Sequence, residues 1–273
     1  MRLSIWITGA NGRVGRELYR LIANESTRII TTDIDVDITD LETVTQFAAI
    51  NHPDVIINCA AVTDPEYCEN NRTEAFRVNA LGARNIAVAA HSVNAKLIHI
   101  STDDIFENTH DGFFNEFDVP APVSVYAKSK LAGEMMVREL VARHIIIRTS
   151  WLYGGVGDNF VTRVISAAKE NKPIEIVKDR QGSPTSVNAL AEVIKKLIGS
   201  NEYGIFHIAC EGSCTREEFA RAILDLNGLD GEFVYKKARF RPNNARIENL
   251  MLKMTGIHEM PNWYDALKNF NFN

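Results

Sequence analysis

Short apolar runs alternate with amphipathic stretches along the first half of the chain. In the amphipathic stretches, apolar residues recur every three or four positions, as Val14, Leu18 and Leu21 do, which is the spacing of one helix face. The apolar runs are short enough to be buried strands. The expected strands are residues 3–7, 28–32, 54–60, 96–101 and 144–150, and the expected helices are residues 12–24, 37–50, 73–93 and the stretch around residues 126–130.

Strands this apolar, alternating with helices, predict a parallel sheet that is covered on both faces. This is the doubly wound (Rossmann) α/β fold, which binds ligands at the carboxyl ends of its strands. After Tyr153 the pattern changes, and the strands expected at 172–177 and 204–209 are isolated among helices. We therefore expect a dinucleotide-binding domain at 1–150 and a smaller C-terminal lobe at 151–273 that partly interleaves with it.

Composition and charge narrow the classes of function. The chain has 273 residues, of which 45% are hydrophobic and 24% charged, and its net charge is -5. These values are ordinary for a globular protein, and the absence of a basic tract argues against nucleic-acid binding. No apolar run has the length of a membrane span. The N-terminus passes directly from an apolar strand into glycines without a signal-peptide cleavage pattern, so we expect a cytoplasmic protein.

The four cysteines do not suggest a metal centre. Together with His207 they match no zinc-binding spacing. We expect reduced structural thiols at Cys59, Cys68, Cys210 and Cys214.

A glycine-rich turn follows the first expected strand. Gly9, Gly12 and Gly15 have the spacing G-x-x-G-x-x-G. Glycines let the backbone turn sharply and let a pyrophosphate approach the start of the next helix, where free N–H groups and the helix dipole favour an anion. Three glycines alone are weak evidence, but these lie between the first strand and the first helix of a βαβ pattern. We expect a dinucleotide to be bound here by Gly9, Asn11, Gly12, Arg13, Val14 and Gly15.

Two charged residues bear on the choice of dinucleotide. Asp33, at the end of the second strand, can accept hydrogen bonds from the adenosine ribose, which favours NAD. Arg13 can instead bind a ribose phosphate, which favours NADP. A turn aspartate and a solvated arginine are the simpler alternatives. Asp37 and Ile38 are expected under the adenine, although a helix cap at Thr39 or Asp40 explains this segment equally well. NAD and NADP both remain open.

Three polar residues converge at the next strand end. Thr102 follows the fourth strand, and Tyr126 and Lys130 are four residues apart, so they share one helix face. A nearby ammonium stabilises a phenolate and lowers the pKa of a tyrosine, which then transfers a proton to or from a carbonyl oxygen near neutral pH. The Thr102 hydroxyl would hold the same oxygen. Without the glycine turn upstream, an exposed tyrosine and lysine would be the simpler interpretation.

These motifs, in this order, resemble those of the extended short-chain dehydrogenases/reductases, and most closely the dTDP-4-dehydrorhamnose reductase branch. The resemblance covers nearly the whole chain. It rests on "GANGRVG", "DITD", "PDVIINCAAVTDPEYCE", "RVNALGARNIA", "STDDIFE", "SVYAKSKLAGE", "RTSWLYG", "GSPT" and "RPNNAR".

The resemblance implies a role for each matching residue. Thr102, Tyr126 and Lys130 match the catalytic triad, and Asn79 matches an asparagine that supports the lysine. The implied cofactor-binding residues of this half of the site are Cys59, Ala60, Ala61, Thr63, Asn79, Tyr126 and Lys130. The implied substrate-binding residues are Thr102, Asp103, Trp151, which would pack against the sugar ring, and Arg241, which would meet nucleotide phosphates.

The implied activity is the NAD(P)H-dependent reduction of the 4-keto group of dTDP-4-dehydrorhamnose to dTDP-L-rhamnose, with Tyr126 as the proton donor. The C-terminal lobe would then bind the sugar nucleotide. A homodimer is plausible for this fold. Magnesium at Glu66 and Glu69 is also open, with a solvated acidic loop as the simpler alternative.

The sequence departs from the branch at several positions. Asp104 replaces a tyrosine, Val62 replaces another, Arg180 replaces a glutamine and Asn188 an aspartate. The pair Asp103–Asp104 resembles the acidic pair of nucleotide-sugar dehydratases, so an epimerase or dehydratase is one alternative. A regulatory binding subunit like the β subunit of methionine adenosyltransferase is another, because retained catalytic residues do not prove turnover.

Overall fold

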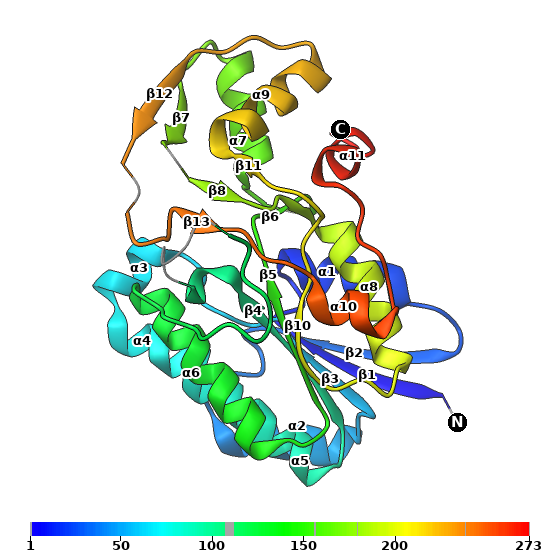
Figure 1. Cartoon of the computed structure of the whole chain (residues 1–273). Coiled ribbons are helices and arrows are strands. Elements are labelled where there is room, and N and C mark those ends of the chain that lie inside the picture. Colours follow the sequence, from blue (N-terminus) through cyan, green and yellow to red (C-terminus); the bar gives the residue numbers. More distant parts are fainter. Residues whose placement is uncertain (1, 107–111, 156, 179, 238, 273) are drawn as a thin grey trace.

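The centre of the molecule is a six-stranded, all-parallel sheet with the order β10-β5-β4-β3-β1-β2 (Figure 1). The computed structural model describes residues 2–106, 112–155, 157–178, 180–237 and 239–272. The sheet confirms the predicted doubly wound fold class. Its strands are β1 (Leu3–Thr8), β2 (Thr27–Thr32), β3 (Val55–Asn58), β4 (Lys96–Thr102), β5 (His144–Thr149) and β10 (Gly204–His207).

Helices cover both faces of this sheet, which explains why its strands are apolar on both sides. In β1, Ile5 and Ile7 belong to one buried cluster, and Trp6, which points the other way, belongs to a second. On the first face α1 (Arg13–Ile22) packs against α8 (Val187–Gly199). On the second face α5 (Ala83–Ser92) packs between α2 (Leu41–Asn51) and α6 (Val125–Leu140).

Elements from the C-terminal half complete this layer structure. Strand β10 pairs with β5 and adds an edge to the sheet, and the α8 helix that precedes it covers the same face as α1. Helix α10 (Leu250–Thr255) packs against β10. The second half of the chain therefore contributes to both the sheet and the lobe.

The lobe stands over the carboxyl ends of the strands, at the top of Figure 1. It has its own buried cluster, which includes Val161, Ile174 and Phe219. Its larger elements are α7 (Phe160–Lys169), β7 (Ile174–Val177), α9 (Arg216–Asn227), β12 (Phe233–Lys236) and α11 (Trp263–Lys268). The short strands are β6 (Leu152–Tyr153), β8 (Gln181–Gly182), β9 (Thr185–Ser186), β11 (Cys214–Thr215) and β13 (Asn244–Ala245). They pair with one another in small sheets of their own, with β8 between β11 and β13, and β6 beside β9.

The single helix expected at 73–93 is divided in the structure. After α3 (Pro65–Asn70) and α4 (Arg72–Phe76), the π-helix η1 (Arg77–Gly82) leads into α5. The Asn79 side chain bonds both the N–H and the carbonyl of Val62, at 2.9 Å each, so η1 is tied to the segment after β3. Short π-helices are frequent at functional sites, and this one lies beside the predicted cofactor segment.

Among the residues that the structure describes, no helix is both long and apolar enough to cross a membrane.

Candidate active site

The glycine turn joins β1 to α1 with the close approaches that its sequence predicts. Gly9 has a φ of +62°, and a Cβ at this position would lie 2.6 Å from the backbone nitrogen of Ala60. A Cβ at Gly15 would lie 2.6 Å from the Cα of Ala10. A larger residue at position 9 would therefore push the turn away from the segment after β3, and one at position 15 would open the turn itself. Gly12 is the N-cap of α1 and leaves the first N–H groups of the helix available for an anion.

A cavity of about 520 Å³ opens beside this turn, which is a volume typical of small-molecule sites. It brings together most of the predicted cofactor residues: Gly9, Asn11, Gly12, Asp33, Asp37, Ile38, Cys59, Ala60 and Ala61. Its walls do not include the other predicted residues, which are Arg13, Val14, Gly15, Thr63, Asn79, Tyr126 and Lys130. Sequence patterns did not point to the rest of its lining, which is Ile34, Val36, Val62, Glu74, Arg77 and Val78.

Asp33 both supports the turn and faces the cavity. One carboxylate oxygen accepts from the Asn11 N–H at 2.8 Å, and the other accepts from the Ile34 N–H at 3.1 Å. A carboxylate has further acceptor capacity, so Asp33 can still bind a ribose hydroxyl.

The two arginines near the turn have different surroundings. The Arg13 guanidinium donates to the carbonyl of Asp158 at 2.9 Å, and burial lowers its pKa. Arg13 therefore contacts the lobe. It does not line the cavity beside the glycine turn, and that cavity is where a ribose phosphate would lie. Arg77, from η1, lines the cavity instead, while it pairs with Glu74 at 2.7 Å and donates to Thr39 at 2.7 Å.

The tyrosine, lysine and threonine lie at the carboxyl end of β4, as expected. All three are buried: Thr102 at the strand end, and Tyr126 and Lys130 on α6. The Lys130 ammonium donates to the carbonyl of Ile100 at 2.6 Å, and burial lowers its pKa to about 8. Asn79 supports this helix through a 2.9 Å bond to the hydroxyl of Ser129.

The acidity of Tyr126 depends on a residue from the lobe. Burial raises the pKa of the phenol, and Arg241 and a hydrogen bond with Thr102 oppose that rise. The Lys130 ammonium, one helical turn from Tyr126, is directed to the Ile100 carbonyl. The expected action of Lys130 on the phenol stays a prediction, and Arg241 from the lobe adds a cation beside the Tyr126 ring.

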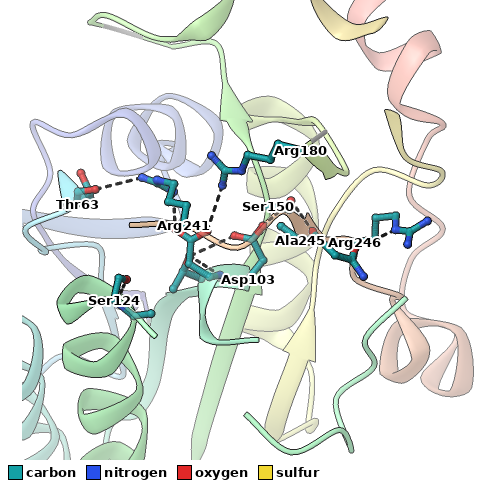
Figure 2. A network of polar contacts seen from close by, with 12 residues as sticks. Thr63, Asp103, Ser124, Ser150, Arg180, Arg241, Ala245 and Arg246 are labelled. Carbon is teal, nitrogen blue, oxygen red and sulfur yellow. Dashed lines mark hydrogen bonds and ion pairs between the residues drawn. The ribbon is translucent and has the colours of Figure 1, made fainter. Parts of the chain in front are cut away.

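Two arginines share the Asp104 carboxylate above the strand end. Arg180 lies 3.3 Å from one oxygen and Arg241 lies 2.5 Å from the other. In Figure 2, Arg180 and Arg241 approach the end of β4, where Asp103 is also labelled. Asp104 and Arg180 are both departures from the branch pattern, and the structure pairs them with each other.

Asp103 is directed to the other side of the same strand end. Its carboxylate accepts from Ser150 at 2.8 Å and from Thr102 at 3.2 Å. Burial, together with the charge of Asp104, raises the pKa of Asp103 to about 7. The carboxyl group next to Thr102 can therefore exchange a proton near neutral pH.

Trp151 follows β5 in a strained backbone conformation with a φ of +42°. The Arg216 guanidinium lies 3.5 Å from the centre of its ring, and Gly182 leaves the room that the indole occupies. One face of the ring is thus covered by an arginine, and the predicted contact with a sugar would use the remainder of the indole.

A second cavity, of about 560 Å³, lies in the lobe and was not foreseen from sequence patterns. Its lining includes five cationic side chains, which are Arg163, Lys172, Arg180, Arg216 and Lys236, and three carboxylates, which are Asp158, Glu170 and Glu175. Each of the three carboxylates pairs with one cation, namely Arg163, Lys172 or Lys236. The Arg216 guanidinium lies over the rings of Trp151 and Phe160, which hold it in place by cation–π interaction.

The suggested metal site is not supported by the geometry. In the parts of the chain that the structure describes, no group of three or more His, Cys, Asp or Glu side chains is arranged to hold a metal ion. One of the two suggested ligands, Glu69, accepts from the Val125 N–H at the start of α6 at 2.8 Å. The four cysteines are free thiols.

The arrangement of fold and site defines the class of protein. The doubly wound sheet carries a glycine turn, and a tyrosine and a lysine lie one helical turn apart at a strand end. A second lobe stands over the same end of the sheet. This is the architecture of the extended short-chain dehydrogenases/reductases. Within this class, the chain belongs to the family described as RmlD substrate binding domain, whose model matches residues 1–271.

Individual relatives cover nearly the whole chain. The spore coat polysaccharide biosynthesis protein SpsK of Bacillus subtilis is 32% identical, over 97% of this chain and 96% of the relative. A dTDP-4-dehydrorhamnose reductase of Mycobacterium tuberculosis is 35% identical, over 96% of this chain and 90% of the relative. The crystal structure of a dTDP-4-dehydrorhamnose reductase from Bacillus anthracis in complex with NADP is 39% identical, with a TM-score of 0.95 and coverage of 99% and 98%.

Proposed function

We propose that the protein reduces the 4-keto group of dTDP-4-dehydrorhamnose to give dTDP-L-rhamnose, with NADH or NADPH as the hydride donor. The observation that carries the proposal is a bridge of polar contacts that links the cavity beside the glycine turn to the cavity in the lobe. Thr63, which adjoins the cofactor cavity, accepts from Arg241 at 3.5 Å, and Arg241 shares Asp104 with Arg180 of the lobe cavity. Tyr126 lies beneath this bridge, 5.6 Å from the Arg241 guanidinium.

The chemistry assigns one task to each residue of the strand end. The reduced nicotinamide supplies a hydride to the keto carbon when it is bound. Tyr126 gives its phenolic proton to the keto oxygen, so the carbonyl becomes a hydroxyl. Thr102 donates a hydrogen bond to the same oxygen and holds it within reach of the phenol. Lys130, anchored on the Ile100 carbonyl at 2.6 Å, supports the cofactor side of the site.

The lobe supplies the groups that a nucleoside diphosphate requires. Arg216, Arg180 and Arg241 offer planar donor pairs for phosphate oxygens. Trp151 remains our candidate for contact with the sugar. The relatives named as dTDP-4-dehydrorhamnose reductases support this choice of substrate.

The acidic pair bears on the dehydratase alternative. A dehydratase needs a carboxyl group that is free to take and give a proton at the sugar. Both oxygens of Asp104 are occupied by arginines, so Asp104 does not meet this need. Asp103 accepts hydrogen bonds from Ser150 and Thr102 and has a pKa raised to about 7, so the choice of the reductase over the dehydratase rests on the named relatives. A solved UDP-glucose 4-epimerase of Thermotoga maritima, at 17% identity and a TM-score of 0.86, shares the fold alone.

Oxidation of NADH and NADPH with the keto sugar nucleotide, followed by absorbance, tests the proposal. We expect oxidation that requires the sugar, and Tyr126→Phe should reduce turnover by about 10²–10⁴-fold while cofactor binding is retained, because the proton donor is lost and the fold is not. Comparing the two cofactors also decides between them. Cofactor binding without any sugar-dependent oxidation would refute the reductase, and equal loss of binding and turnover in Tyr126→Phe would assign the tyrosine a structural role.

A further inference from the structure

A cation from a distant part of the chain lies over the ring of the predicted proton donor. The guanidinium carbon of Arg241 lies 5.6 Å from the centre of the Tyr126 ring, which is within the range of a cation–π interaction. By contrast, the Lys130 ammonium on the same helix as Tyr126 is engaged by the carbonyl of Ile100. A residue expected only to bind phosphate is therefore also placed to act on the proton donor.

Asp104 holds Arg241 in this position. Its side chain is fully buried, and one of its oxygens lies 2.5 Å from Arg241 Nη1. The other oxygen pairs with Arg180, so one carboxylate serves two guanidiniums and the cluster keeps a net positive charge. The Arg241 side chain is 31% exposed, so it keeps an edge available for a ligand while the carboxylate fixes its place above the ring.

The groups that face the phenol from β4, the turn after it and α3 do not supply a positive charge. From β4 and the turn after it, Asp103 and Asp104 both raise the pKa of Tyr126. From α3, Cys68 packs against Tyr126, and burial raises the pKa of that thiol, so it is neutral. Arg241 is thus the group that offsets the two carboxylates.

We propose that Arg241, held by Asp104, is a positioning residue that assists the departure of the proton from Tyr126, in addition to any contact with phosphate. The inference rests on the proposed reduction for its catalytic consequence. When the phenol gives its proton to the keto oxygen, a negative charge develops on the phenolate, and a fixed cation over the ring stabilises that charge.

The test compares Arg241→Gln with Arg180→Gln, since both remove an arginine from the same carboxylate but only one lies over Tyr126. For Arg241→Gln we expect kcat to fall about tenfold, the alkaline limb of its pH profile to move up by about one pH unit, and the solvent deuterium isotope effect to increase. Arg241→Lys should restore part of kcat. Arg180→Gln should raise KM and leave the alkaline limb in place. An Arg241→Gln enzyme that changes KM alone would overturn the proposal.

A second measurement is independent of the substrate. Ring-carbon NMR of isotope-labelled tyrosine, with the Tyr126 signal assigned through Tyr126→Phe, follows ionisation of the phenol in the cofactor-bound protein. We expect Tyr126 to ionise at higher pH in Arg241→Gln than in the wild type or Arg180→Gln. If Tyr126 behaves identically in all three proteins, the inference is wrong, whatever the substrate proves to be. If the shift is present but the keto sugar is not reduced, only the proposed function fails.

Discussion

Two buried arginine–carboxylate clusters lie at the same end of the sheet and differ in what they connect. Arg148 of β5 meets Glu134 of α6 at 2.8 Å, and both side chains are almost completely buried. The cluster around Asp104 instead joins the strand end to two segments of the lobe. The first closes a contact within the sheet and its helix; the second leaves Arg241 partly exposed beside a cavity. The same pairing of arginine with carboxylate therefore stabilises the fold in the first cluster and holds side chains of the candidate site in the second.

The difference follows from how completely each carboxylate is enclosed. Glu134 accepts three hydrogen bonds from Arg148 and one from Ser101, all from neighbouring elements of one layer. Asp104 is enclosed only when the lobe is in place, because its two partners come from the lobe. A ligand can reach the exposed edge of Arg241 while Asp104 holds it, whereas the Glu134 side chain is only 1% exposed.

The largest effect is expected from breaking the enclosed cluster. Glu134→Ala leaves the Arg148 guanidinium buried without its carboxylate, and should lower the free energy of unfolding by about 3–5 kcal/mol in denaturant titrations. The double variant Glu134→Leu/Arg148→Met is the control, since it removes both charges and should be clearly more stable than the single variant. A loss of under about 1 kcal/mol in Glu134→Ala would mean that this cluster is not structural.

An intermediate effect is expected from the pH dependence of the site. The pKa of Asp103 is raised to about 7 by burial and by Asp104, whereas the unfolded chain has the ordinary value of about 4. The folded state therefore binds a proton that the unfolded state lacks, and stability falls as pH rises from about 4 to about 7. The midpoint temperature of thermal unfolding should fall less steeply across this pH range in Asp103→Asn than in the wild type. A constant difference between the two proteins at every pH would contradict the assignment.

The smallest effect is expected from removing either of the two serine hydroxyls that donate to these clusters, and the two variants should differ in how their stability depends on pH. Ser101 donates to Glu134 at 2.5 Å, and Ser150 donates to Asp103 at 2.8 Å. Ser101→Ala should cost about 1–3 kcal/mol of stability at every pH, because it removes one bond to a charged group. Ser150→Ala should raise the pKa of Asp103 further and extend the pH-dependent fall in stability upward. If the free energy of unfolding changes with pH in the same way in both variants, the expected difference between the two serines is wrong.

Local patterns were sufficient for the framework of the protein. The apolar period of β1 and the glycines at 9, 12 and 15 identified the strand, the turn and the helix start. The four-residue spacing of Tyr126 and Lys130 placed both on α6. These features depend on backbone geometry over a few residues, so they can be inferred from neighbours in the chain.

The partners of those residues depended on tertiary structure. Arg241 and Asp104 are 137 residues apart, and no local pattern links them. The side-chain direction of Lys130, toward Ile100, and the π-helix around Asn79 likewise result from packing against other elements. Sequence alone determined which chemical groups the site contains; only the folded chain decided which charge faces the phenol, because burial and the docking of the lobe orient each side chain.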